Sequence, residues 1–274
     1  RIPMIKMCIV CIAAGLAWGV GVGIVGMSAA TVLPPMLIAF LGCPWYEAVG
    51  IGLMADVPAA AIAARTYKKH GYVDLKNGRF MLAAVLVMVI IGSYLSQYMP
   101  DTEMGLFSVV MTLFMGAKFV LQPGGSDSRR SFLREGQRGK ILSLLAGAYI
   151  GLYCGFVGLG GGLMMLFVLN VILGYELKMA VGTSVFVMTF TAFIGAVSHF
   201  AFGDVTGYII PMIICTVVTF ICSAVSSSIA NRISTERAHR ITGVVLLILG
   251  AIMIVAEWEN VVSTFYIVMK MLGA

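Results

Sequence analysis

The glycine-rich breaks inside apolar segments are the part of this sequence best suited to bind a ligand. One break, in the second half of the chain, contains Gly158, Gly160, Gly161 and Gly162. Adjacent glycines interrupt a helix and let the backbone approach a ligand closely. The N–H groups and the positive dipole at the start of the following helix can then bind an anion. This run therefore predicts an anion site.

A second break of the same kind, in the first half, contains Gly26, Ser28 and Thr31. Its two hydroxyls can donate hydrogen bonds to an anion. Thr183 and Ser184 begin another apolar segment, where their hydroxyls and the N–H groups of the first helical turn could complete the site. The alternative for these two hydroxyls is a bond to their own helix backbone. We expect the residues of both breaks and these two hydroxyls to bind the substrate.

Asp56 is an acidic residue deep inside an apolar segment. An ionisable group within a membrane segment is a functional candidate by default. Asp56 could accept a proton, bind a cation or pair with a base such as Lys118 or His199. A carboxylate repels an anion, so we expect it to couple ions or stabilise the structure. His199 is expected near the external end of its helix, as a proton relay or an interfacial residue.

The amino-acid composition indicates that these residues lie in helices that are embedded in a lipid bilayer. Apolar residues make up 60% of the 274 positions, charged residues only 11%, and the mean hydropathy is +1.01. Soluble proteins carry about 25% charged residues, and a membrane helix needs about 20 apolar residues. The net charge of +6 would suggest nucleic acid in a soluble protein. Here the basic residues are confined to short loops, as the positive-inside rule describes.

The chain contains an internal duplication. A shift of 132 residues places Gly15 on Gly147 and Gly19 on Gly151, and 17 of the 60 positions in 14–73 become identical. Composition alone predicts about five identities. The spacing of these four glycines favours close helix packing rather than binding.

Loop charges give the two copies opposite orientations. Loops 65–79, 122–140 and 231–240 are basic. In loops 99–103 and 202–206, by contrast, all the charged residues are acidic. Basic loops face the cytoplasm. Because 65–79 and 202–206 occupy equivalent places in the two copies, the repeats are predicted to be inverted, with the amino terminus external.

The sequence thus predicts an all-α polytopic membrane protein with two inverted-topology repeats of about five membrane segments each. Residues 1–121 form the first membrane repeat, 122–140 a basic cytoplasmic linker and 141–274 the second membrane repeat. Segments 28–41 and 160–174 are too short for an upright span. Each follows a glycine-rich break and is expected to be a broken or re-entrant helix.

Two motifs in the second half read Gly151-x-x-x-Gly155-x-x-Gly158-x-Gly160-Gly161-Gly162 and Ala180-Val-Gly-Thr-Ser184. Together they resemble the sulfite exporter TauE/SafE family. The resemblance implies duplicated membrane modules that move sulfite, sulfoacetate and related anions across the cytoplasmic membrane. The first half departs from the pattern, because Ser28-Ala29-Ala30 stands in place of the glycine run.

These observations predict a secondary transporter that exports small anions, such as sulfite or organosulfonates, by alternating access. The chain contains no phosphate-binding loop and no catalytic constellation, so we expect no enzyme activity, cofactor or metal. The alternatives are a proton- or sodium-coupled uptake carrier, or an anion channel, for a small organic or sulfur-containing anion. The expected partners are that anion and the lipid bilayer of the cell inner membrane, not nucleic acid. The sequence leaves homo-oligomerisation open.

Overall fold

The described part of the computed structural model is helical, and the helices are joined by short turns. It comprises residues 4–26, 28, 33–96, 113–114, 116–117, 120–121, 136–157, 161–202 and 206–256. The all-α expectation is confirmed for this part of the chain, which contains no strand. Most of the expected segment 104–121 lies outside it.

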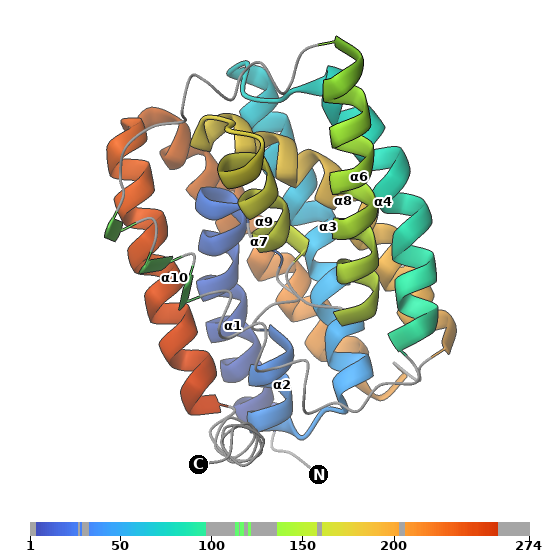
Figure 1. Cartoon of the computed structure of the whole chain (residues 1–274). Coiled ribbons are helices and arrows are strands. Elements are labelled where there is room, and N and C mark those ends of the chain that lie inside the picture. The colour runs from blue at the N-terminus through green and yellow to red at the C-terminus, as the bar shows by residue number, and fades with distance from the viewer. Residues whose placement is uncertain are drawn as a thin grey trace, which may run out of the picture.

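The helices form one bundle (Figure 1). Those of the first half are α1 (Met4–Val25), α2 (Leu33–Leu41), α3 (Trp45–Lys69) and α4 (Leu75–Ser96). Those of the second half are α6 (Gly136–Val157), α7 (Gly161–Phe167), α8 (Leu177–Phe202), α9 (Ile209–Arg232) and α10 (Thr235–Ala256). A π-helical turn, η3 (Val168–Ile172), extends α7, and a 3-10 turn, η4 (Thr206–Tyr208), precedes α9.

Four of the described helices are long and apolar enough to cross a membrane, in the ranges Met4–Val25, Glu47–Lys69, Leu177–Ala201 and Ile209–Arg232. The apolar parts of α4 and α6 are shorter. Helix α2 has nine residues and α7 has seven. At about 1.5 Å per residue neither can cross the roughly 30 Å hydrocarbon layer upright, as expected for segments 28–41 and 160–174.

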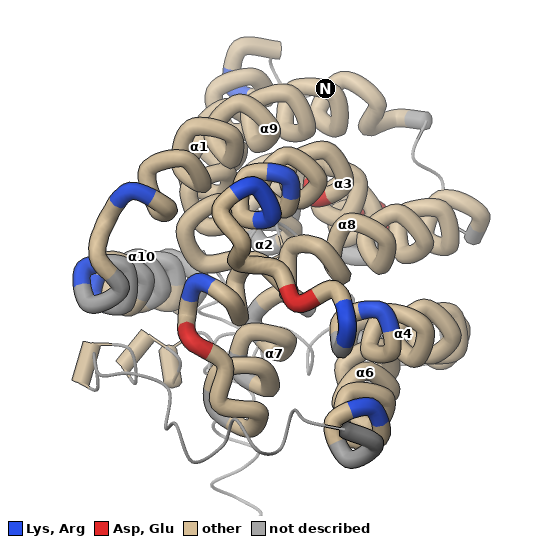
Figure 2. The backbone as a smooth tube through the Cα atoms, turned by 90° about the horizontal axis from the view of Figure 1, so that it is seen from above, with Lys and Arg blue, Asp and Glu red and all other residues tan. Residues whose placement is uncertain are grey.

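The long helices pack in pairs that join the two halves of the chain. Helix α1 packs on α9, α6 packs on α4, and α3 packs on α8 between these two pairs. Contacts of α3 with α9 and of α8 with α4 complete the layer. Figure 2 shows α3 and α8 side by side, with α1 and α9 on one side and α4 and α6 on the other.

Glycines make the α1–α9 and α4–α6 contacts close. A Cβ on Gly19 would lie 2.3 Å from Cβ of Cys222, and one on Gly151 would lie 2.6 Å from the carbonyl oxygen of Val85. Both distances are shorter than a van der Waals contact, so each position accepts only glycine without a shift of the partner helix. The packing role predicted for these glycines is confirmed.

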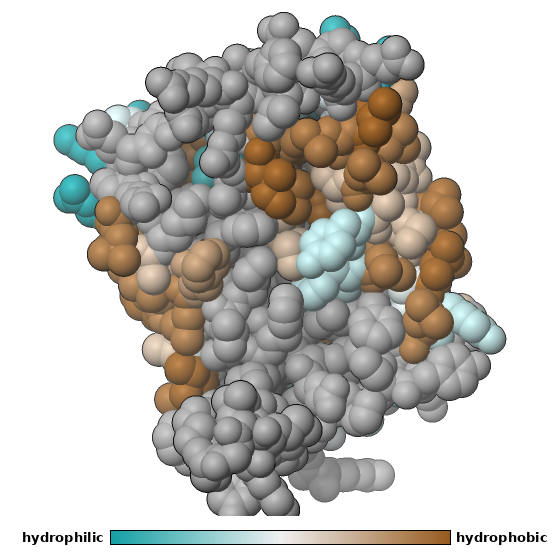
Figure 3. Space-filling view, in the orientation of Figure 1, coloured by the Kyte–Doolittle hydropathy of each residue, from teal (hydrophilic) through white to brown (hydrophobic). Residues whose placement is uncertain are grey.

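The surface divides into a charged end and an apolar belt. Most Lys and Arg positions lie at the end of the bundle that faces the viewer in Figure 2, where α3 and α9 end and where α4, α6 and α10 begin. Below that end, apolar side chains cover much of the visible described surface (Figure 3). Exposed examples include Val87, Leu145, Ile213, Val225 and Ile248. Such a belt is what a bilayer requires.

Candidate functional site

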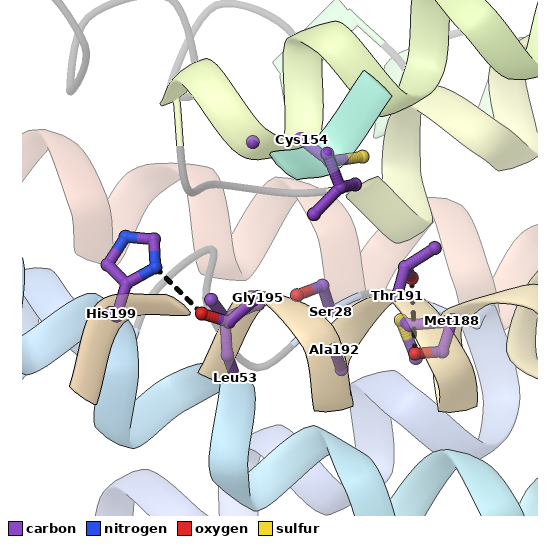
Figure 4. A pocket seen from close by; sticks show the side chains of 10 residues that line it. Ser28, Leu53, Cys154, Met188, Thr191, Ala192, Gly195 and His199 are labelled. Carbon is purple, nitrogen blue, oxygen red and sulfur yellow. Dashed lines mark hydrogen bonds between the residues drawn. The ribbon is translucent and has the colours of Figure 1, made fainter. Parts of the chain in front are cut away.

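A small cavity lies among α3, α4, α6, α8 and the chain segment that follows α1 (Figure 4). Its volume is about 20 Å³, which is room for about one water molecule. It is lined by Ser28, Leu53, Val89, Cys154, Gly155, Met188, Thr191, Ala192, Gly195 and His199. Two of the predicted site residues, Ser28 and His199, are therefore brought to the same cavity.

Helix α8 supplies half of this lining from one face. Its lining residues recur about every three or four positions, at Met188, at Thr191 and Ala192, at Gly195 and at His199. This spacing aligns side chains along a helix. His199 is 3% exposed, and its Nδ1 lies 2.9 Å from the carbonyl oxygen of Gly195. Because a carbonyl only accepts, Nδ1 carries the proton of this bond. The hydroxyl of Thr191 likewise donates to the carbonyl of Met188 at 3.2 Å.

Asp56 is connected to the cavity through Ser28. The Oγ of Ser28 donates to Oδ2 of Asp56 at 2.5 Å, and both residues are buried. Asp56 is fully buried within α3, and the cavity wall includes Ser28 but not Asp56. A proton on Asp56 would therefore change the hydrogen bonding of a wall residue without placing the carboxylate against a bound anion.

Two further predicted residues meet beside this point. Gly26 ends α1 with a φ of +70°, a left-handed conformation that suits glycine and not residues with a Cβ. Its N–H donates to the carbonyl of Val22 at 3.0 Å. A Cβ on Gly26 would lie 2.7 Å from Oγ of Ser184, which itself donates to the carbonyl of Val181 at 2.8 Å. The glycine break of the first half thus contacts α8 of the second half.

Thr183 lies apart from this cavity wall. Its hydroxyl accepts a hydrogen bond from the backbone N–H of Asp74 at 3.0 Å, and the hydroxyl of Tyr175 donates to Oδ2 of Asp74 at 2.7 Å. The first contact ties the start of α4 to α8, and the second ties it to the segment that leads into α8. The bond of Thr183 is therefore made to another segment and not to its own helix backbone, whereas Ser184 bonds to its own helix.

The glycine run is only partly within the described residues. Gly161 begins α7, and Gly162 is buried in its first turn. Gly158, Gly160, Thr31 and Lys118 lie outside the described residues.

A buried tyrosine occupies the position in α3 that corresponds to His199 under the 132-residue shift. The hydroxyl of Tyr67 donates to the carbonyl of Gly23 at 3.0 Å, and Tyr67 is 1% exposed. Gly23 corresponds in the same way to Gly155, which lines the cavity beside His199. In the first half a hydrogen bond therefore joins the residues at these two positions. In the second half the corresponding residues border a cavity.

Tyr67, Thr191 and Gly195 are not among the residues that the sequence predicts for the site. The signal for Thr191 is its spacing, since it stands seven residues after Ser184 and eight before His199, which places all three on one helix face. The signal for Tyr67 is the repeat itself. Among the described residues, no cluster of three His, Cys, Asp or Glu side chains forms that could hold a metal.

Comparison with known proteins agrees with this architecture. A family model described as "Sulfite exporter TauE/SafE" matches residues 11–253. The chain is also 24% identical over 200 residues to a Bacillus subtilis (strain 168) protein described as "Probable membrane transporter protein YunE". That match covers 68% of this chain and 73% of the relative. No solved structure matches the chain significantly.

Proposed function

We propose that this chain, which belongs to the sulfite exporter TauE/SafE family, is a secondary transporter that exports a small anion by alternating access. The family description names sulfite, and we include organosulfonates in the proposed substrate class as related sulfur-containing anions. The observation that carries the proposal is the buried cavity between the two halves, whose wall includes Ser28, Thr191 and His199.

The packing of the helices supports an inverted repeat. Under the 132-residue shift, α1 corresponds to α6, α3 to α8 and α4 to α9. The contact of α1 with α9 then corresponds to that of α6 with α4, and α3 meets its own counterpart, α8. A two-fold relation that exchanges the halves produces this pattern, and transporters with inverted repeats bind substrate near such an axis.

The two copies of the site differ in the way alternating access requires. At the end of α3 nearest the basic loops, the bond between Tyr67 and Gly23 would close the transport path. At the corresponding place in the second copy, His199 and Gly155 border a cavity. Exchange of these two arrangements between the halves would open one side while it closes the other.

The cavity wall combines hydroxyl and imidazole groups with the apolar side chains of Leu53, Val89 and Met188. In the described conformation the hydroxyls of Ser28 and Thr191 and the Nδ1 of His199 donate to other protein groups. Binding of an oxyanion would therefore require these donors to turn toward it as the cavity widens. With a volume of about 20 Å³, the cavity is too small for a sulfite ion, so the described conformation is a closed one that must widen to bind.

Orientation and energetics favour export. The basic end of the bundle would face the cytoplasm and the amino terminus the outside, in the inner membrane of the cell. Export of an anion from a negative interior is downhill by about 2.3 kcal/mol per charge per 100 mV. Potential alone could therefore drive this transport.

A second candidate, proton-coupled anion transport, is favoured by the bond between Ser28 and Asp56. A serine hydroxyl has one donor hydrogen and two acceptor sites. While Asp56 is ionised, it takes that hydrogen. When Asp56 is protonated it can donate to Ser28 instead, which turns the serine hydrogen toward the cavity. Proton binding and anion binding would then favour each other.

Thermal stabilisation by a panel of oxyanions tests the proposed substrate class. Purified protein is mixed with sulfite, isethionate, sulfate, phosphate or acetate at equal ionic strength, and Tm is measured. A ligand that binds only the folded state stabilises it by an amount that grows with the ratio of its concentration to its Kd. We expect sulfite or the sulfonate to raise Tm at lower concentrations than the other anions do. Equal shifts with all five anions would count against a specific anion site.

A further inference from the structure

Two adjacent hollows lie at the basic end of the bundle, one between α3 and α9 and the other along α9 alone. One has a volume of about 340 Å³ and is lined by Ile62, Arg65, Thr66, Lys69, His70, Ser228 and Arg232. The other has a volume of about 350 Å³ and is lined by Ala224, Val225, Ser228, Ile229 and Arg232. They share Ser228 and Arg232, so they form a continuous groove.

The spacing of these residues shows that one face of each helix forms the groove. On α3 the other lining residues stand three, four and seven positions after Ile62. On α9 the residues from Ala224 to Arg232 recur at steps of four. Both patterns place side chains along a single helix face. The bond from Ser223 Oγ to the carbonyl of Ala59, at 2.8 Å, holds the two helices together one turn deeper.

One end of the groove is strongly cationic. Arg65, Lys69 and Arg232 line the same hollow, and its described lining includes no carboxylate. Cations in the last turn of a helix are favoured by the helix dipole. That effect explains one cation on each helix, but it does not explain why three of them face one hollow, where they repel each other. An anion between them would remove this repulsion.

The other end of the groove is apolar and faces the lipid. Val225 is 57% exposed and Ile229 is 50% exposed. They continue a row of exposed apolar side chains along α9 that includes Ile213, Val217 and Ile221. This face lies in the apolar belt, so its neighbour in a membrane is an acyl chain.

We propose that this groove binds an anionic phospholipid of the cytoplasmic leaflet. Its phosphate lies among Arg65, Lys69 and Arg232, and an acyl chain follows Val225 and Ile229. Basic pockets between membrane helices on the cytoplasmic side bind such headgroups. The groove does not include Ser28, Thr191 or His199, so it is separate from the cavity and independent of the proposed transport.

The test compares two triple variants with equal loss of charge. The first is Arg65→Gln, Lys69→Gln, Arg232→Gln. The matched control is Lys68→Gln, Arg237→Gln, Arg240→Gln, which removes three exposed cations from the same end of the bundle but none from the groove. The full chain in neutral detergent is titrated with short-chain phosphatidylglycerol, phosphatidylcholine or inorganic phosphate, and Tm gives the affinity.

We expect phosphatidylglycerol to bind the wild type more tightly than phosphatidylcholine or inorganic phosphate does. Each groove cation adds about 1 kcal/mol, so the groove triple variant should lose about 100-fold in affinity and the control triple far less. Equal losses in both triples would show diffuse surface attraction and overturn the proposal.

A second comparison separates the lipid from a free anion. Val225→Ser with Ile229→Ser should weaken phosphatidylglycerol binding and leave phosphate binding unchanged. If inorganic phosphate stabilises the wild type as well as the lipid does, the occupant is a free anion and the lipid assignment is wrong. Circular dichroism of each variant confirms that the helices are retained before affinities are compared.

Discussion

Ser28 donates a hydrogen bond to Asp56 that connects the segment after α1 with the middle of α3. Ser28 lines the cavity and Asp56 does not. The carboxylate is therefore near enough to influence a bound anion and is kept from direct contact with it. Because Ser28 stands between them, the buried carboxylate of Asp56 is compatible with the anionic substrate that we propose.

The first prediction concerns Asp56→Asn. The amide cannot gain or lose a proton, so transport driven by a pH gradient should be lost, while potential-driven export should remain near the wild-type rate. Flux in proteoliposomes under each gradient measures the effect. Asp74→Asn, at a carboxylate away from the cavity, is the control and should keep the pH response.

The second prediction concerns the hydroxyl of Thr191. Thr191→Val keeps the side-chain shape and removes the hydroxyl from the cavity wall, whose hydrogen is bonded to the carbonyl of Met188 in the described conformation and would turn to a bound anion. A hydrogen bond to a charged group contributes about 1.5–3 kcal/mol, so anion affinity should fall at least tenfold, as read from Tm titrations with sulfite. Thr189→Val is the matched control, because Thr189 bonds to the carbonyl of Val185 and does not line the cavity. Equal affinities in the two variants would remove Thr191 from the site.

The third prediction concerns the closed end of the path. Tyr67→Phe removes the bond to the carbonyl of Gly23, which should weaken the closed state by about 0.5–1.5 kcal/mol. The end of α1 should then open more often, and hydrogen exchange of its backbone amides should accelerate about two- to tenfold. Tyr149→Phe, at an exposed position of α6, should leave that exchange unchanged. Unaltered exchange in Tyr67→Phe would show that this bond does not hold the path shut.

The fourth prediction concerns the glycine contacts between helices. Gly19→Ala places a Cβ 2.3 Å from Cβ of Cys222, and overpacking of this kind costs about 1–3 kcal/mol. The Tm should fall by several degrees. Gly207→Ala has no neighbouring atom within 4 Å of the added Cβ, and its Tm should stay within a degree or two of the wild type.

Much of the fold follows from the sequence, because membrane helices are set by length and hydropathy. The apolar segments, the two short helices and the packing role of Gly19 and Gly151 all follow from local composition and spacing. Which helices pair cannot be read from local pattern. The contact of α1 with α9 joins Gly19 to Cys222, and it depends on how two whole repeats fit together.

The candidate site could be predicted only in part, for the same reason. Asp56 and His199 stand out because they are ionisable residues in apolar helices. The bond from Ser28 to Asp56, and the contact of Gly26 with Ser184, each join residues that are far apart in the sequence. Thr183 and Ser184 are neighbours in α8, and the sequence predicts the same role for both hydroxyls. One step along a helix turns a side chain by about 100°, and Thr183 instead holds the start of α4.

Counterflow of sulfite in proteoliposomes tests alternating access most directly. Vesicles that contain the wild-type protein are loaded with labelled sulfite, and efflux is followed with and without unlabelled sulfite outside. A carrier whose site faces one side at a time should show saturable efflux that external sulfite accelerates, and Thr191→Val should need more sulfite for the same acceleration. Efflux that neither saturates nor responds to external sulfite would contradict the account and indicate an open pore.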